Sequence, residues 1–256
     1  MEKSHHSNAI GIDLGTTKTT LSVWTNGHTE VILNEEEERY TPTCVCFTEE
    51  ERLVGSMAQS FVGKHPWNSV PGFKRLFGAK DSDPAVQTLV ATLPYKIEST
   101  PNGALEVRVD YRGTRRFSIE QIASVFLSTL KRHAESFLRA EVTCAVLSVP
   151  STFALPHVQS LKAAAAIAGL RVLNTISEGA LAGTEYAYRS FDDMNSKIVL
   201  FVNMGGGYLD VSLCNVQAGS CFVICTGGCE VGGVDIDNAL AQHCIEHFSQ
   251  KHRKLT

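Results

Sequence analysis

Long hydrophobic runs are missing from this sequence of 256 residues, and no stretch of about eighteen apolar residues is present to span a bilayer. The N-terminal segment MEKSHHSN also lacks the apolar core of a secretory signal peptide. We therefore expect a protein that does not enter a membrane and that is located in the cytoplasm.

Clusters of basic residues are missing as well. The 23 Lys and Arg are scattered among 27 Asp and Glu, and the formal net charge is −4. Neutralising a nucleic-acid backbone requires a basic patch or stripe, so nucleic acid is not an expected partner. Hydrophobic residues make up 43% of the chain, which is enough for one large domain or two smaller ones with cores of their own.

The sequence contains eight cysteines, most of which fall within apolar, strand-like runs. There we expect small buried hydrophobic side chains with free thiols, as in a reducing cytosol. A zinc site is the alternative for the set Cys221, Cys225, Cys229, His243, Cys244 and His247. Packing is the favoured interpretation, because Cys221 and Cys225 would share one face of the strand CFVIC.

Turn signals and apolar periodicity divide the chain into segments. Ala9–Trp24 predicts a β-hairpin with a tip of Gly and Thr, and residues 40–117 mix short strands with Gly and Pro breaks, as in a smaller inserted subdomain. Ser118 begins a capping box and an amphipathic helix, and Val142–Val149 is a continuous apolar strand. A helix, a strand and a helix follow before strands return at residue 197, which predicts an α/β fold with helices packed on a sheet.

The segment Ile198–Val216, IVLFVNMGGGYLDVSLCNV, aligns without gaps with the N-terminal hairpin. Asn203 falls on Asp13 and Gly205 on Gly15, so the chain contains one hairpin unit twice. One glycine-rich turn would be no more than a hairpin, but the repetition favours a function.

Both tips offer backbone N–H groups to a ligand, because a Gly and Thr tip forms an anion-binding concavity. Neither tip has the lysine of a P-loop, and neither opens a helix as in a Rossmann fold. We therefore predict that the phosphates of a nucleotide such as ATP bind between two facing hairpins.

Several segments resemble the ATPase, or nucleotide-binding, domain of the seventy-kilodalton heat-shock (DnaK-type) chaperones. They are GIDLGTTKT at Gly11–Thr19, TPTCVCFT at Thr41–Thr48, FKRLFG at Phe73–Gly78, AVLSVPSTF at Ala145–Phe153 and VGGVDIDNAL at Val231–Leu240. The resemblance covers nearly the whole chain. It implies an actin-like ATPase fold with a ribonuclease H-like motif and two related lobes. The first lobe would span residues 1–196. Residues 197–256 would form the beginning of the second lobe, which is incomplete in this sequence.

The resemblance also implies roles for individual residues. Asp13 would hold hydrated Mg²⁺, Lys74 would position the attacking water, and Glu178 would order magnesium-bound water. The residues expected at the phosphates of ATP or ADP are Gly15, Thr16, Thr17 and Lys18 in the first tip and Gly205, Gly206, Gly207 and Tyr208 in the second.

Four positions depart from the family pattern. Asn203 replaces an aspartate, and an amide cannot supply the negative charge that binds Mg²⁺ or helps to activate water, so this metal ligand is degenerate. Tyr208 replaces a Thr beside the phosphate, and Lys18 either adds a cation or points into solvent. Val158 replaces the arginine that relays the nucleotide state. We expect a divergent member that hydrolyses ATP slowly.

The resemblance implies a J-domain co-chaperone and a nucleotide-exchange factor as partners. Unfolded clients would be bound only through a C-terminal domain that the family carries beyond this sequence, together with its adenosine-binding segment. The alternative is a regulatory or scaffold domain that binds a J-domain or ribosome-associated partner without nucleotide. A sugar or acetate kinase would share the hairpins, but FKRLFG and VGGVDIDN argue against it.

Overall fold

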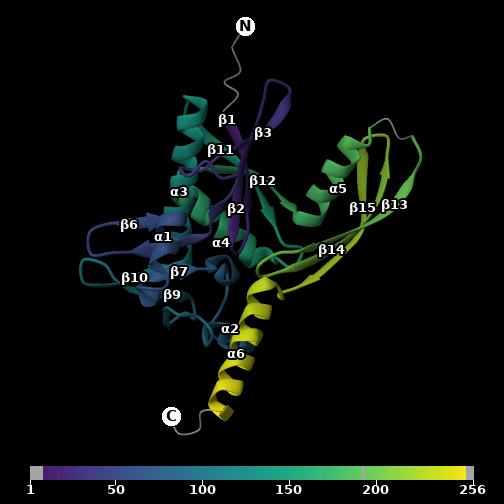
Figure 1. Cartoon of the computed structure of the whole chain (residues 1–256). Coiled ribbons are helices and arrows are strands. Elements are labelled where there is room, and N and C mark those ends of the chain that lie inside the picture. Colours follow the sequence, from purple (N-terminus) through teal and green to yellow (C-terminus); the bar gives the residue numbers. More distant parts are fainter. Residues whose placement is uncertain (1–7, 192–193, 252–256) are drawn as a thin grey trace.

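The computed structural model describes residues 8–191 and 194–251, and its largest sheet is mixed (Figure 1). The strand order is β12-β11-β1-β2-β3, with β4 paired to β2. The strands are β1 Asn8–Leu14, β2 Lys18–Thr25, β3 His28–Ile32, β4 Thr41–Pro42, β11 Val142–Val149 and β12 Arg171–Ser177. β1 runs antiparallel to β2 and parallel to β11, so this sheet joins the N-terminal hairpin to the α/β segment far along the chain.

Two helices cover this sheet and form the main core. α3 spans Ile119–Leu138, and its capping box between Ser118 and Gln121 is present as the sequence predicted. Its stripe of Ile122, Phe126 and Leu130 is fully buried in the core. α4 spans Leu155–Ile167 and packs beside α3.

The inserted segment forms two small antiparallel sheets and several short helices. Their bounds are β5 Cys44–Phe47, β6 Arg52–Val54, β7 Ser69–Pro71, β8 Lys96–Ser99, β9 Leu105–Asp110, β10 Thr114–Ser118, α1 Ser56–Phe61, α2 Pro84–Val90, η1 Pro66–Asn68 and η2 Phe73–Leu76. Phe73 is buried against Phe126 of α3, with ring centroids 5.7 Å apart. This contact fixes the η2 turn, which carries Lys74 and Arg75, against the main core.

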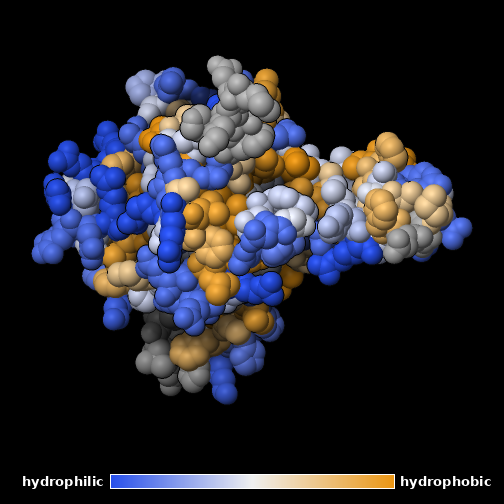
Figure 2. All heavy atoms as spheres, turned by 90° about the horizontal axis from the view of Figure 1, so that it is seen from above, coloured by the Kyte–Doolittle hydropathy of each residue, from blue (hydrophilic) through white to orange (hydrophobic). Residues whose placement is uncertain are grey.

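A second sheet projects from the body and is built from β13 Lys197–Met204, β14 Leu209–Gln217 and β15 Ser220–Cys229 (Figures 1 and 2). Helix α5, Glu178–Arg189, packs on one face of it through Ala187. A Cβ at Gly183 would lie 2.5 Å from Cys221 Sγ, so glycine allows this close approach. α5 lies before residue 196, within the predicted first lobe, but it packs on the second sheet. The lobe boundary at residue 196 therefore remains a prediction.

The opposite face of the second sheet is apolar and exposed. The side chains Ile198, Leu200, Val202, Phe222 and Ile224 are each more than half exposed. Helix α6, Gly233–Lys251, extends away from the body and buries none of its residues. Within residues 8–191 and 194–251, no helix has the length and hydrophobicity needed to cross a bilayer.

The cysteine prediction is correct for one half of the set and wrong for the other. Cys44, Cys46, Cys144 and Cys214 are buried, Cys221 is half-buried, and Cys225, Cys229 and Cys244 are exposed. For Cys225 and Cys229 the error arises because an apolar strand was expected to be covered, whereas β15 lies at the edge of a sheet with one open face. Cys244 is exposed because it lies on α6, which buries none of its residues. No cluster of three or more metal-ligating side chains occurs in the described ranges.

Candidate functional site

The two hairpins have the same register. Leu14 pairs with Thr19 and Met204 with Leu209, so each tip has four residues between paired strand ends. One position earlier on each first strand, Asp13 pairs with Thr20 and Asn203 with Asp210. The repeat seen in the sequence is therefore a repeat of backbone structure.

The tips of the two hairpins touch. A Cβ added at Gly206 would lie 2.6 Å from Thr17 Cγ2, and one at Gly207 would lie 2.7 Å from Thr16 Oγ1. Such distances are too short for a real Cβ, so glycine is required at both positions while the tips are in contact. No phosphate group fits between them in this arrangement.

The tips nevertheless have the donors that an anion needs. The backbone N–H groups of Thr16, Thr17, Gly206 and Gly207 donate no hydrogen bond to any part of the chain that the structure describes. Grouped backbone N–H groups of this kind form concave sites for phosphate oxygens. The donor set fits a nucleotide phosphate, and the space for it requires the tips to separate.

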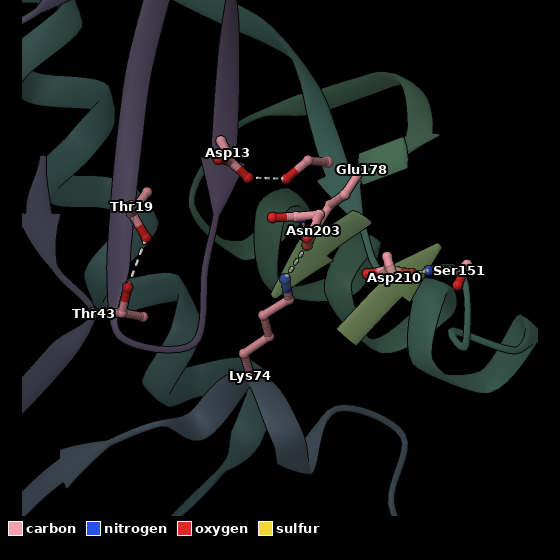
Figure 3. Close-up of polar contacts among 9 residues, drawn as sticks. Asp13, Thr19, Thr43, Lys74, Ser151, Glu178, Asn203 and Asp210 are labelled. Carbon is pink, nitrogen blue, oxygen red and sulfur yellow. Dashed lines mark hydrogen bonds and ion pairs between the residues drawn. The ribbon is translucent and has the colours of Figure 1, made fainter. Parts of the chain in front are cut away.

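Beside the tips, Lys74, Glu178 and Asn203 form one network (Figure 3). Lys74 Nζ lies 2.8 Å from Glu178 Oε1, and its side chain is 3% exposed. The Asn203 amide donates to the other carboxylate oxygen, Glu178 Oε2, at 2.7 Å. Both oxygens of Glu178 are thus occupied by donors of the protein itself.

Asp13 lines the same site. Its side chain accepts a hydrogen bond from Ser148 Oγ of β11 at 2.5 Å, because β1 and β11 are paired parallel strands. A cavity of about 340 Å³ is lined by Asp13, Ser148, Glu178 and Asn203 together. The structure therefore brings the three predicted catalytic residues, Asp13, Lys74 and Glu178, to one place.

Sequence reasoning missed Asp210, which is 1% exposed on β14 (Figure 3). Its Oδ1 accepts the backbone N–H of Ser151 at 2.6 Å, whereas Oδ2 is buried with no hydrogen-bond partner in the described chain. A buried carboxylate oxygen without a donor is costly and is the kind of atom that a cation or water satisfies. The sequence held a signal, since Asp210 is the one acidic residue of the strand that follows the second tip.

Two predicted phosphate-tip residues have partners elsewhere in the protein. Lys18 Nζ lies 4.1 Å from the centroid of the Tyr40 ring. Tyr208 is buried edge-on against Phe153, and Lys74 Nζ lies 5.4 Å from its ring centroid. Burial, reinforced by nearby Glu230, raises the pKa of Tyr208, so its hydroxyl remains protonated.

Arg75 joins the inserted segment to the start of α6 and was also not predicted. Its Nη1 lies 2.9 Å from Asp235 Oδ1, and Nη2 donates to the carbonyl of Glu230 at 2.9 Å. On the other side of the site, Ser151 Oγ donates to the Gly227 carbonyl at 3.0 Å. These contacts hold the second hairpin and α6 against the body.

The mixed sheets flanked by helices, with a repeated hairpin and facing tips, define the actin-like class of ATPase folds, as the sequence predicted. Within that class the chain belongs to the Hsp70 protein family, whose family model matches residues 9–255. The domain resemblance drawn from the sequence is thereby confirmed.

Three relatives illustrate this membership. The chain is 40% identical over 248 residues to the Homo sapiens "Putative heat shock 70 kDa protein 7", covering 96% of this chain and 67% of that protein. It is 39% identical over 250 residues to "Heat shock cognate 70 kDa protein 3" of Dictyostelium discoideum, covering 96% and 40%. It is 38% identical over 248 residues to "Heat shock 70 kDa protein" of Neurospora crassa, covering 96% and 38%. The chain spans about two fifths of the length of the last two.

Proposed function

We propose that this chain is the ATP-binding region of a heat-shock-type chaperone and that it binds magnesium nucleotide phosphates between its two hairpin tips. One observation carries the proposal: two tips with free backbone N–H groups face each other beside the carboxylates of Asp13, Glu178 and Asp210. Hsp70 ATPase domains normally use a nucleotide and Mg²⁺, which agrees with this donor set.

Each group has a role that follows from its chemistry. The N–H groups of Thr16 and Thr17, and those of Gly206 and Gly207, would bind phosphate oxygens once the tips separate. Asp13 and the free oxygen of Asp210 would orient a hydrated cation, which when bound neutralises charge on the phosphates. Lys74 would place its ammonium beside the attacking water. Gly15, Gly205, Lys18 and Tyr208 would complete the walls of the two tips.

Slow hydrolysis follows from the contacts of Glu178. Lys74 and Asn203 take about half of the roughly four acceptor sites of the Glu178 carboxylate, so fewer remain to order water on a metal ion. An aspartate at position 203 would repel Glu178 and require a cation between them, whereas the amide donates to it instead. We infer that Asn203 replaces a metal contact with a protein contact and leaves the site weakly catalytic.

The test is the thermal midpoint of the chain with and without magnesium ADP and magnesium ATP. A ligand at about 100 times its Kd stabilises the folded state by about 2.7 kcal/mol, so specific binding raises the midpoint clearly. Gly206→Ala should lower the midpoint without nucleotide and so enlarge the rise that nucleotide produces, because its methyl group would meet Thr17 while the tips are in contact. Gly227→Ala is the matched control, since no atom lies within 4 Å of a Cβ there.

A nucleotide-independent scaffold that binds a J-domain or ribosome-associated partner is the second candidate. The closed tips and the protein donors on both oxygens of Glu178 favour it, because these two features need no ligand. No shift of the midpoint, repeated with a chain extended to the length of its relatives, would establish this candidate over the first. Under the first proposal, the partners are a J-domain co-chaperone and an exchange factor, clients bind through a further domain, and the location is cytoplasmic.

A further inference from the structure

A second cavity lies on the inserted segment, beside the first hairpin tip. It has a volume of about 290 Å³ and shares no lining residue with the acidic cavity around Asp13 and Glu178. Thr16 and Thr17 form one wall, residues of the inserted segment form another, and Val234 and Asn238 of α6 form the third. Its volume is near the lower end of the range for small-molecule pockets, about 300–1,000 Å³.

The walls of this cavity are largely apolar and carry no available charge. Apolar lining comes from Pro42, Val62, Pro71, Leu89, Leu93 and Val234. Burial raises the pKa of the Cys44 thiol to about 12, so that side chain is neutral. Arg75 is the one charged residue in the described lining; its two Nη groups are engaged by Asp235 and the Glu230 carbonyl, and its Nε is buried with no hydrogen-bond partner in the described chain. Because the charge of Arg75 is already paired with Asp235, the lining offers no unpaired charge to offset the lost hydration of a charged ligand.

Two side-chain amides in the lining are available for hydrogen bonding. Gln59 and Asn238 are both exposed, and neither side chain makes a hydrogen bond within the ranges described. Each amide offers an acceptor oxygen and a donor NH₂ group. An apolar cavity with such groups in its lining favours a ring that buries large area at low entropic cost and has polar atoms at its edge.

We propose that this cavity binds a compact, uncharged aromatic molecule whose edge carries both a hydrogen-bond donor and an acceptor. Its occupant would contact the inserted segment and α6 at once, the two parts that the Arg75–Asp235 pair already joins. Binding therefore strengthens the contact between the inserted segment and α6. The site requires no nucleotide.

The test is a calorimetric titration of the full chain, without nucleotide, using indole, indole-3-carboxamide and indole-3-carboxylate as probes. We expect saturable one-to-one binding of the carboxamide, about tenfold tighter than the carboxylate, which corresponds to about 1.4 kcal/mol. Val62→Trp fills the cavity and should weaken carboxamide binding by at least about tenfold. Ser60→Trp, near it in sequence but outside the lining, is the control.

A further variant covers the case in which Val62→Trp does not fold. Gln59→Leu changes an exposed side chain, and it should reduce the preference for carboxamide over plain indole while leaving the thermal midpoint unchanged. Absence of saturable binding up to the solubility limit, or carboxamide binding unchanged by both substitutions, would overturn the proposal. Since no nucleotide is present, either result leaves the nucleotide test independent.

Discussion

At the scale of single residues, the site depends on which atoms satisfy Glu178. The amide of Asn203 supplies a donor at 2.7 Å where a carboxylate would supply a second negative charge. The difference between the amide of Asn203 and the carboxylate of an aspartate therefore decides whether this site needs a cation. The neighbouring Asp210 differs from Glu178, because its buried Oδ2 has no hydrogen-bond donor in the described chain.

Asn203→Asp should make the folded state dependent on Mg²⁺. Without the metal, two carboxylates would lie within contact distance and destabilise the fold, whereas Mg²⁺ would restore stability and increase ATP turnover. The measurement is the thermal midpoint across a Mg²⁺ titration, followed by phosphate release. Asn215→Asp on β14 is the matched control, because its oxygen already accepts a bond from Ser196. An unchanged response to Mg²⁺ would contradict the assigned role of Asn203.

Asp210→Asn should separate stability from metal binding. The Ser151 hydrogen bond can be retained and a buried charge is removed, so stability without nucleotide should stay equal or rise by up to about 1 kcal/mol. The part of the nucleotide effect that depends on Mg²⁺ should be lost. Midpoints measured in Mg²⁺ and in a chelator provide the comparison, with Asp237→Asn on α6 as the exposed control. Retention of the Mg²⁺ effect would show that Asp210 does not orient the cation.

At the scale of elements, local signals predicted local structure. The strand Val142–Val149 was predicted with its observed bounds, and α3 begins where its capping box indicated. The repeated hairpins were also found, because gapless alignment preserves register. These features depend on residues close together in the chain.

Features that depend on distant packing were not predictable in this way. Apolar periodicity shows that α5 has a buried face but not that this face meets β14 and β15. The contact of Gly206 with Thr17 and the reach of Arg75 to Asp235 join segments more than 150 residues apart. The predicted catalytic residues came from family resemblance, whereas Asp210 and Arg75 required the fold.

Ser118→Ala tests the contribution of the α3 cap. The hydrogen bond from Gln121 N to Ser118 Oγ would be lost, whereas the backbone N–H of residue 118 could still donate to Gln121 Oε1. We expect a loss of about 1 kcal/mol in the free energy of unfolding, measured by urea denaturation. Ser136→Ala, an exposed position near the other end of α3, should change it little. Equal effects of the two substitutions would argue against a capping contribution.

At the scale of the whole molecule, the second sheet has one covered face and one open face. α5 packs on the first, while β13 and β15 present Ile198, Leu200 and Phe222 to solvent on their exposed surfaces. Within the described residues β13 pairs only with β14, so it is an edge strand of the kind that can pair with another chain. An exposed apolar face beside an edge strand favours self-association of the isolated chain.

Leu200→Lys should lower this association. A charge in the centre of the open face opposes burial against another copy, and because Leu200 is 59% exposed the fold should be retained. Sedimentation at several protein concentrations measures the effect. Thr29→Lys adds the same charge at an exposed position of β3 and should leave association unchanged. A wild-type chain that remains monomeric at high concentration would contradict the prediction.

The η2 turn has a mechanical consequence for the molecule. Its consecutive residues Lys74 and Arg75 bind Glu178 at the start of α5 and Asp235 at the start of α6. One short turn therefore contacts the first turns of two helices. A displacement of this turn would strain both ion pairs at once, so the starts of α5 and α6 are coupled through a single segment.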